Sequence, residues 1–576
     1  MVLLSEPFLT IVAILATLII LGTIIALHEL GHLIAAKRAG VMCFDYSIGM
    51  GPVIYKKKPG ETQYSIRAVP IGGFVQMAST IDLSSDILKE GNIGLELDDD
   101  NKIIEIILDP ARDSTVRGKV VELDLVGKDN DMYITLEDEN GELTQYFMAD
   151  QATYTFEKNQ KLAISKYERT VDSKSKPWRL IVFFAGSFMN FVLAIIIYLI
   201  VSFSMGVPNY ESNEIGSISS DFPASAYLEV GDKIRGINGE SVSSWTDFQN
   251  KMNDIYSKYQ TTIQITFLRD GVENTQEIES VTGFNSIGIS NFYAKNNKLS
   301  LIPNTTLKGL EIGQVFSKYK NSSDEKYEYR IQAKDYLVGI QIGDTEYPLN
   351  NDSYIIKDGL EVSGWGYLTY LVDEYIGKGA QDVKYKYYHL KDDKGTEDTS
   401  DDEYIPIDYN NSKIITPYTD EVLESQNVTK ILHYIGVGPT THFSFFGCIG
   451  NAFSMFWDDF TMIFRTLKLL LFPSDVRQVG INNLSGVVGI FGRIKSYVNS
   501  GIITLLAFVA MLSVNIGIVN LLPIPALDGG KILFVIIEAI TGKKVPKKIE
   551  NAINLVFMLL LLGLMVYVTF NDIMRL

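Results

Sequence analysis

The sequence predicts a polytopic α-helical membrane protein, with four transmembrane helices and β-rich soluble insertions between them. The chain has 576 residues, enough for several domains of about 150 residues each. Its composition is 46% hydrophobic, yet its formal net charge is −18. Four stretches without a charged residue are long enough to cross roughly 30 Å of hydrocarbon, which takes about 20 helical residues. We therefore expect apolar spans joined to acidic segments that are exposed to water.

The four uncharged stretches define the predicted transmembrane part. The first lacks a basic leading region and is too long for a secretory signal, so we expect it to be retained. A fifth apolar stretch, 441–472, contains charged residues that each cost roughly 2.5–3.5 kcal/mol at a bilayer centre. We expect an interfacial amphipathic helix there, within a region 441–497 that also holds a Leu484-Ser485-Gly486 loop. The predicted spans are Phe8–Leu27, Leu180–Val207, Val498–Leu527 and Asn551–Asn571, in regions 1–40, 176–207, 498–530 and 551–571.

Basic residues predict the orientation of the spans. One basic cluster follows the first span, and a second separates the third span from the fourth. The positive-inside rule places both clusters in the cytoplasm and the long segment between spans two and three outside. Cys43 and Cys448 then lie on opposite sides and cannot pair. With a pI near 4.9, we expect the lipid bilayer but no nucleic acid as a partner. The clusters are Lys37, Arg38, Lys56, Lys57 and Lys58, and then Lys543, Lys544, Lys547 and Lys548.

Two soluble segments follow the first span on the cytoplasmic side. In region 41–79, Val53–Lys58 and Gln63–Val69 alternate in polarity around a Pro-Gly turn, which predicts a β-hairpin. The Pro70–Phe74 stretch is expected to break the second strand. Region 80–175 is acidic and alternates in short runs, which predicts a small β-rich cytoplasmic domain without an assigned role.

The outward segment contains an internal repeat. Gly231–Gly239 is similar to Asp335–Gly343, and each copy has a tryptophan shortly after this phrase. We expect two tandem modules, 208–292 and an enlarged 306–440, in which the acidic tip 392–403 is a solvated turn. Each copy is expected to close on its own phrase. These phrases are Ile287-Gly288-Ile289 in the first copy and Ile435-Gly436-Val437 in the second.

The first module resembles a PDZ domain of the kind found in bacterial membrane and periplasmic proteases. The resemblance rests on Phe222–Ala226 and on the Gly231–Gly239 phrase. Such domains take an extended peptide as an added strand at an open sheet edge. Alternatively, the two PDZ-like modules only crowd an entrance and exclude folded proteins. The sequence favours neither role over the other.

The chemistry is predicted at the inner end of the first span, in the motif His28-Glu29-Leu30-Gly31-His32. Residues four apart on a helix share one face, so both imidazoles can reach one Zn²⁺ ion. Glu29 can act as the general base on water at that ion. The alternative, that these groups only satisfy each other in a helix, is costly because ionisable groups at membrane depth are expensive.

A catalytic zinc site needs a third protein ligand, and Asp528 is the candidate. It follows the third span in the phrase Asn520–Gly530, and that span runs inward to the depth of His28 and His32. Two prolines stop the helix, and Gly529 and Gly530 are expected to let the backbone turn. Three ligands with one open position are typical of a catalytic zinc site. The remaining alternative is that Asp528 caps the next helix.

Taken together, these motifs resemble the site-2 protease family of intramembrane zinc metalloproteases, most closely the bacterial regulator-of-sigma-factor protease type. The family usually has proline where Ser187 and Val487 stand, at positions without chemistry. Besides the two metal motifs and the PDZ-like modules, the resembling phrases are Gly49–Pro52, Arg67–Met77, Ala185–Asn190 and Leu484–Ile490.

The resemblance implies a zinc metalloendopeptidase of the bacterial cell membrane, with one Zn²⁺ per chain and an active site near the cytoplasmic side. It implies that the substrates are single-span membrane proteins, such as anti-sigma factors or remnant signal peptides. It also implies that segment 64–77 offers a strand edge to an unwound substrate helix. The implied substrate-binding residues are Asn190, Asn520, Gly72, Gly73 and Phe74. For Asn190, an interhelical hydrogen bond is the alternative role.

Two other functions fit parts of the sequence. A zinc transporter would also place histidine and aspartate in the membrane, but the outer halves of spans one and three are apolar. An inactive peptide-binding scaffold built on the PDZ-like modules would have no chemical need for Glu29. Metal flux in proteoliposomes tests the first alternative, and deletion of 209–440 tests the second.

Overall fold

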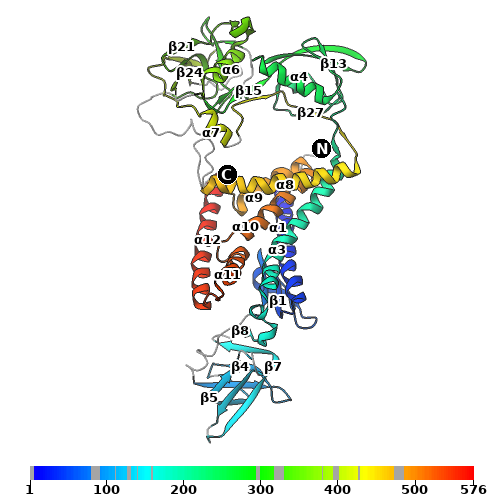
Figure 1. Cartoon of the computed structure of the whole chain (residues 1–576), viewed down its shortest axis with the longest axis vertical. Coiled ribbons are helices and arrows are strands. Elements are labelled where there is room, and N and C mark those ends of the chain that lie inside the picture. Colours follow the sequence, from blue (N-terminus) through cyan, green and yellow to red (C-terminus); the bar gives the residue numbers. More distant parts are fainter. Residues whose placement is uncertain are drawn as a thin grey trace. The chain divides into compact units, whose positions relative to one another are not determined.

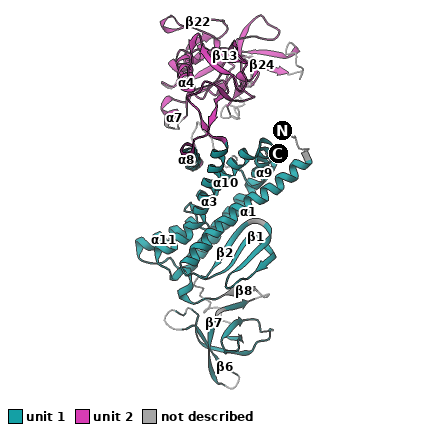
Figure 2. Ribbon diagram, turned by 90° about the vertical axis from the view of Figure 1, so that its right-hand side faces the viewer, with its two compact units in different colours: residues 1–204, 448–467, 481–576 teal, residues 205–447, 468–480 magenta. Residues whose placement is uncertain are grey.

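The chain forms two compact units, 1–204 with 448–467 and 481–576, and 205–447 with 468–480 (Figure 2). The expected turn at 392–403 and the start of the Leu484-Ser485-Gly486 loop fall largely outside the described residues. The computed structural model describes residues 6–78, 91–110, 112–125, 127, 131–138, 141–156, 160–292, 299–316, 330–378, 381–392, 401–425, 428–471 and 485–575.

Within the described residues, four helices of the first unit are long and apolar enough to cross a membrane, in agreement with the four predicted spans (Figure 1). The first helix continues beyond the predicted span to Arg38, so it carries the whole histidine motif. The third begins at Ile502 and not at Val498, because Gly501 has φ +109° and separates it from the preceding helix. The four helices are α1 (Glu6–Arg38), α3 (Lys176–Met205), α10 (Ile502–Leu521) and α12 (Lys547–Arg575).

Three further helices in the described part of the first unit pack among these spans. The amphipathic stretch predicted at 441–472 is helical, and its buried side contributes Ala452 and Ile463 to an apolar core with Ile24, Val201 and Val509. A second helix follows the glycine of the Leu484-Ser485-Gly486 loop, and a third follows the predicted Asp528 phrase. They are α8 (Phe445–Leu471), α9 (Val487–Ser500) and α11 (Asp528–Thr541).

The segment after α1 is a long hairpin of β1 (Cys43–Lys57) and β2 (Gln63–Met77). The expected break at 70–74 is wrong, because β2 continues through it. Gly72 has φ +81°, and β2 folds around β1 so that Tyr46 of β1 lies opposite both Tyr64 and Val75. The glycine lets the strand bend where an L side chain would be strained. Residues 73–77 thereby become an edge of this small sheet.

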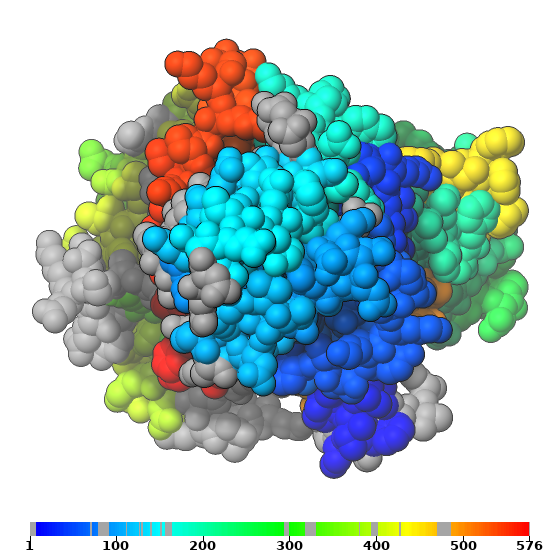
Figure 3. Space-filling view, turned by 90° about the horizontal axis from the view of Figure 1, so that it is seen from below, coloured from blue at the N-terminus to red at the C-terminus, as the bar shows by residue number. Residues whose placement is uncertain are grey.

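A separate β-domain follows, as the alternating pattern of 80–175 predicts. Its strands form one sheet in the order β4-β3-β5-β6-β7-β8, and β4 also pairs in parallel with β7. This extra pairing closes the sheet around a core that includes Ile93, Ile106 and Ile134. Figure 3 shows the outer surface of the domain in light blue to cyan. The strands are β3 (Asn92–Leu97), β4 (Ile103–Ile107), β5 (Val116–Asp124), β6 (Tyr133–Glu137), β7 (Leu143–Phe156) and β8 (Gln160–Ala163).

The second unit contains the two repeats, but one is inserted within the other. The core around Trp245 includes Ile435, and β10 pairs with β27, so the phrase at 435–437 closes the first repeat. The core around Trp365 includes Ile287 and Ile289, so the phrase at 287–289 belongs to the second. The expectation that each copy closes on its own phrase is therefore wrong. β15 and β26 pair antiparallel as the entry and exit of the insertion.

The elements of the second unit are short, as is typical of small β modules. The helices are α4 (Trp245–Ser257), α6 (Gly364–Tyr375) and α7 (Asp420–Ser425). The first repeat and its flanks contain β9 (Val207–Pro208), β10 (Ile215–Ile218), β11 (Lys233–Ile237), β12 (Glu240–Ser241), β13 (Thr262–Arg269), β14 (Val272–Glu279), β27 (Val437–Pro439) and β28 (Thr441–His442). The insertion contains β15 (Val281–Phe284), β16 (Ile289–Ser290), β17 (Ser300–Leu301), β18 (Lys308–Glu311), β19 (Gln314–Val315), β20 (Tyr336–Ile342), β21 (Thr345–Pro348), β22 (Tyr354–Ile355), β23 (Glu361–Val362), β24 (Val383–Asp392), β25 (Glu403–Ile407) and β26 (Ile431–Tyr434).

Candidate metal centre

The C-terminal half of α1 presents His28 and His32 on one face. Both side chains are buried, with exposed fractions of 6% and 4%. Their Nε2 atoms lie 3.3 Å apart, and the rings meet edge to face. This is the geometry that a four-residue spacing on a helix predicts. The opposite ring nitrogen of His32, Nδ1, donates to the carbonyl oxygen of Val182 on α3 at 2.7 Å.

Asp528, which lies 496 residues beyond His32, completes this cluster. Its Oδ2 atom is 2.9 Å from Nε2 of His32 and 3.2 Å from Nε2 of His28. Asp528 is the first residue of α11, and its carboxylate contacts the imidazoles and Lys531 Nζ (3.2 Å). The Asp528 carboxylate does not cap α11, so this alternative role is wrong.

The two glycines after Asp528 have a different role from the expected one. Both lie in the first turn of α11, where the backbone is helical. A Cβ at Gly530 would lie 2.7 Å from Cα of Pro525, and one at Gly529 would collide with the carbonyl oxygens of Leu521 and Leu522. These glycines therefore allow α11 to pack tightly against the end of α10, which sets the position of the Asp528 carboxylate.

The three side chains fit a Zn²⁺ ion. Two imidazole nitrogens and one carboxylate oxygen are the donors of catalytic zinc sites, and these atoms all lie within 4.8 Å of one another. Gly186 of α3 has no side chain, and this leaves open the space beside the Nε2 atoms of both histidines. A Cβ at this glycine would lie 2.7 Å from Nε2 of His28 and closer still to Nε2 of His32. Any larger residue there would compete with an ion for the same space.

A cavity of about 330 Å³ opens onto this cluster. Glu29, the predicted general base, lines it beside the two histidines, and so does Asn520 of α10. The β2 edge also lines this cavity. A Cβ at Gly73 would lie 2.9 Å from the Ser47 carbonyl and 3.1 Å from Cγ of Glu29, so the edge packs against the base itself. The lining residues of β2 are Gly72, Gly73, Phe74, Val75 and Met77.

Four of the five residues implied to bind substrate, Asn520, Gly72, Gly73 and Phe74, line this cavity, and Asn190 does not. Asn190 of α3 has an exposed fraction of 0%, and its Nδ2 lies 3.3 Å from Nδ1 of His28. It contacts a ligand ring on the side away from the ion position. Sequence reasoning missed Gly186, Val182 and Lys531. The signal for Gly186 was present, since it is four residues before Asn190 and therefore on the same face of α3.

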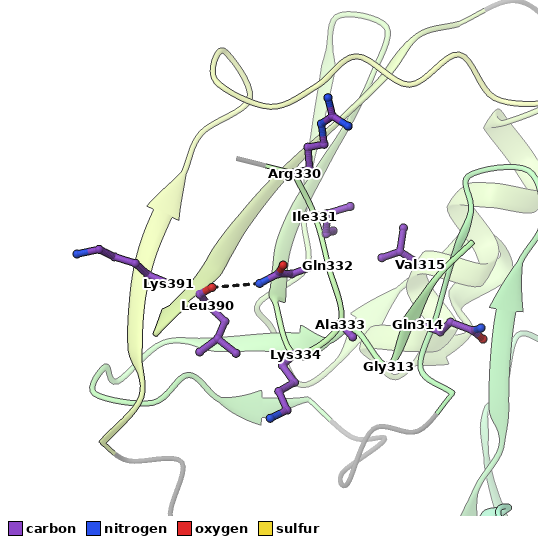
Figure 4. A pocket seen from close by; sticks show the side chains of 10 residues that line it. All are labelled: Gly313, Gln314, Val315, Arg330, Ile331, Gln332, Ala333, Lys334, Leu390 and Lys391. Atoms are coloured by element: carbon purple, nitrogen blue, oxygen red, sulfur yellow. Dashed lines mark hydrogen bonds between the residues drawn. The ribbon is translucent and has the colours of Figure 1, made fainter. Parts of the chain in front are cut away.

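A larger cavity of about 820 Å³ lies in the second unit, within the inserted repeat (Figure 4). Arg330, Lys334 and Lys391 are at its rim, and Nε2 of Gln332 donates to the carbonyl oxygen of Leu390 at 3.1 Å. Its described lining holds no histidine, cysteine or carboxylate. The smaller cavity is therefore the one that combines metal-binding donors with a carboxylate base.

Comparison with known proteins agrees with this geometry. A family model described as Peptidase family M50 matches residues 16–564. The chain belongs to this family. It is 27% identical to the zinc metalloprotease RasP of Bacillus licheniformis, over 98% of this chain and 99% of that one. It is 26% identical to the putative zinc metalloprotease SA1105 of Staphylococcus aureus, over 98% of each.

Family membership confirms the resemblance to site-2 proteases and the predicted enzyme class, a zinc metalloendopeptidase. With four helices of membrane length, the chain is a membrane protease. It is also similar to the solved PDZ domain of an SdrC-like protein from Listeria monocytogenes. That similarity has 26% identity and a TM-score of 0.11, and it covers 12% of this chain and 73% of the other. The number of PDZ-like modules stays a prediction.

Proposed function

We propose that this chain hydrolyses peptide bonds within the transmembrane segment of single-span membrane proteins. One Zn²⁺ per chain is held by His28, His32 and Asp528, and Glu29 is the general base. One observation carries the proposal. Nε2 of His28, Nε2 of His32 and Oδ2 of Asp528, which come from two helices, lie close together at a cavity. A structural zinc site would have four protein ligands, whereas three leave a position for reaction.

The chemistry divides between the ion and the chain. A bound Zn²⁺ supplies Lewis acidity, which acidifies water and polarises the scissile carbonyl. Glu29 takes a proton from the attacking water while the water oxygen bonds to the carbonyl carbon. When the C–N bond breaks, Glu29 returns that proton to the leaving amine. Gly73 positions this base, because the β2 backbone lies directly against the Glu29 side chain.

The β2 edge supports cleavage of a membrane helix. Such a helix hides its peptide groups in its own hydrogen bonds, so cleavage requires local unwinding. Residues 73–75 pair with β1 and line the cavity, and no second strand pairs with them in the described part of the chain. An unwound substrate segment can pair with this edge, so that its freed N–H and C=O groups are satisfied. Asn520 lines the same cavity, and we infer that its side chain holds the unwound substrate segment.

The basic residues support a cytoplasmic position for the active site. Lys37 and Arg38 end α1 one to two turns after His32, and Lys543 and Lys544 follow α11. With these residues inside, the second unit lies outside, where its PDZ-like modules bind an extended peptide or exclude folded proteins. The substrates are then proteins already trimmed on their outer side. Anti-sigma factors and remnant signal peptides belong to this class.

A substitution that removes only the base tests the proposal. In the purified full chain, Glu29→Gln should keep zinc at wild-type stoichiometry and abolish cleavage of a single-span substrate in detergent or liposomes. The matched control is Glu61→Gln, which makes the same change at a hairpin carboxylate that pairs with Arg169 away from the cavity. It should cleave at near the wild-type rate. Retained turnover in Glu29→Gln would refute the role of Glu29, and wild-type zinc content in His28→Ala would refute the ligand set.

A further inference from the structure

Each proposed zinc ligand has a second polar contact on the side away from the ion position. Nδ1 of His32 donates to the Val182 carbonyl, and Oδ1 of Asp528 accepts from Lys531. For His28, the contact on Nδ1 is the side-chain amide of Asn190 at 3.3 Å. Such outer contacts fix the tautomer and orientation of ligand rings. The contact of His28 differs from the other two because an amide can face the ring with either its nitrogen or its oxygen.

The chemistry of the ligand decides between these two orientations. To bind an ion, Nε2 of His28 must have a free lone pair, so the ring proton must be on Nδ1. A protonated Nδ1 needs an acceptor, and the amide group of Asn190 that can accept is Oδ1. Val182 supplies the same kind of acceptor to His32, where a carbonyl oxygen leaves no ambiguity.

The surroundings of Asn190 allow this orientation. Oδ1 of Asn190 is buried and has no hydrogen-bond partner among the described residues, so nothing there holds the amide with its nitrogen toward the ring. Amide nitrogen and oxygen are interchangeable by a half-turn of the terminal group. The backbone is fixed independently, because Ser513 of α10 donates to the Asn190 carbonyl at 2.9 Å. The residue is therefore held in place while its amide is free to turn.

We propose that Asn190 is a positioning residue of the metal centre, whose Oδ1 accepts the proton of His28 Nδ1 and keeps Nε2 available for zinc. This inference rests on the proposed ligand set. It differs from the substrate-holding role that the family resemblance implied, because Asn190 is completely buried and does not line the cavity. A residue that holds substrate affects turnover, whereas one that orients a ligand affects zinc affinity.

Zinc affinity of the purified full chain, measured by competition with a chromophoric chelator, tests the proposal. Asn190→Asp keeps the shape and replaces the amide by a group that only accepts. It should bind Zn²⁺ several-fold more tightly. Asn190→Leu removes the acceptor at similar volume and should weaken zinc binding about 10–100-fold, the range typical of lost outer contacts. Asn520→Leu is the matched control, since it changes an asparagine that lines the cavity, and its zinc affinity should be unchanged.

Each outcome is decisive. If Asn190→Asp weakens zinc binding tenfold or more, the amide donates to His28 and the proposal is wrong. If Asn190→Asp and Asn190→Leu both match wild type in zinc affinity while turnover falls, Asn190 acts on substrate. If Asn190→Leu does not yield folded protein, Asn190→Asp and Asn190→Ala decide in its place. His28→Ala serves as the reference: if it retains zinc, the proposed site itself fails, which is distinguishable from a failure at Asn190 alone.

Discussion

Gly186→Ala should abolish zinc binding with a single added methyl group. The new Cβ would lie 2.7 Å from Nε2 of His28, whereas ordinary Cβ contacts are 3.4 Å or longer. The His28 ring would have to move by about 0.7 Å and the His32 ring by more, or α3 would have to withdraw. Metal–ligand distances tolerate only about 0.2 Å. Overpacking of this kind also costs about 1–3 kcal/mol of folding free energy.

The assay for Gly186→Ala compares zinc per chain after equilibration with a buffered zinc solution, together with the thermal unfolding midpoint. We expect zinc content to fall below about a tenth of the wild-type value and cleavage to be lost, because no ligand geometry remains. The matched control is Gly22→Ala on α1, where a Cβ meets no atom within 4 Å. It should bind zinc normally and be slightly more stable, since alanine favours a helix over glycine. Stoichiometric zinc in Gly186→Ala would refute this account of the site.

Two further substitutions test how buried ionisable groups affect the stability of each unit. Arg179→Met should lower the free energy of unfolding by about 3–5 kcal/mol in a denaturant titration. The substitution leaves the carboxylate of Glu538 on α11 buried without the guanidinium that it pairs with at 2.5 Å. A smaller loss in the double variant Arg179→Met with Glu538→Leu would confirm that the unpaired charge is the cause. Burial lowers the pKa of His433 to about 4, so unfolding takes up a proton between that value and about 6.5, and stability should fall as the pH drops through this window. His433→Gln should remove up to roughly 3 kcal/mol of that pH dependence, and an unchanged pH profile of unfolding would contradict it.

The spans and the metal-binding donors follow from local patterns in the sequence. Twenty apolar residues predict a span in any context, and a four-residue spacing places His28 and His32 together because both are on one helix. Asp528 was found by elimination, because two histidines leave a catalytic zinc site one ligand short and the chain has only five histidines. The predicted inward direction of the third span brought Asp528 to the predicted depth of His28 and His32.

The features that were missed depend on contacts between distant segments. Gly186 matters because α3 faces two rings of α1. Its spacing from Asn190 places both residues on one face of α3, but it does not report what lies opposite that face. The continuity of β2 through 70–74 depends on β1 pairing with both of its halves, which overrides the breaking tendency of Pro70 and the glycines. Asn190 is buried behind His28 for the same reason. Local propensity predicts helices and strands, whereas contacts between distant segments decide what each side chain touches.

The insertion of one repeat within the other sets an order of assembly. Strand β10 is complete early in synthesis, but its partner β27 emerges about 220 residues later, so the first repeat cannot finish until the inserted one has passed. Truncation between 292 and 306 would thus leave an open half-module with an unpaired strand and not a shortened protein. Removal of 209–440 as a whole takes both repeats and leaves only the short β9 and β28 of the described strands in that unit, which pair with each other, so neither loses its partner strand.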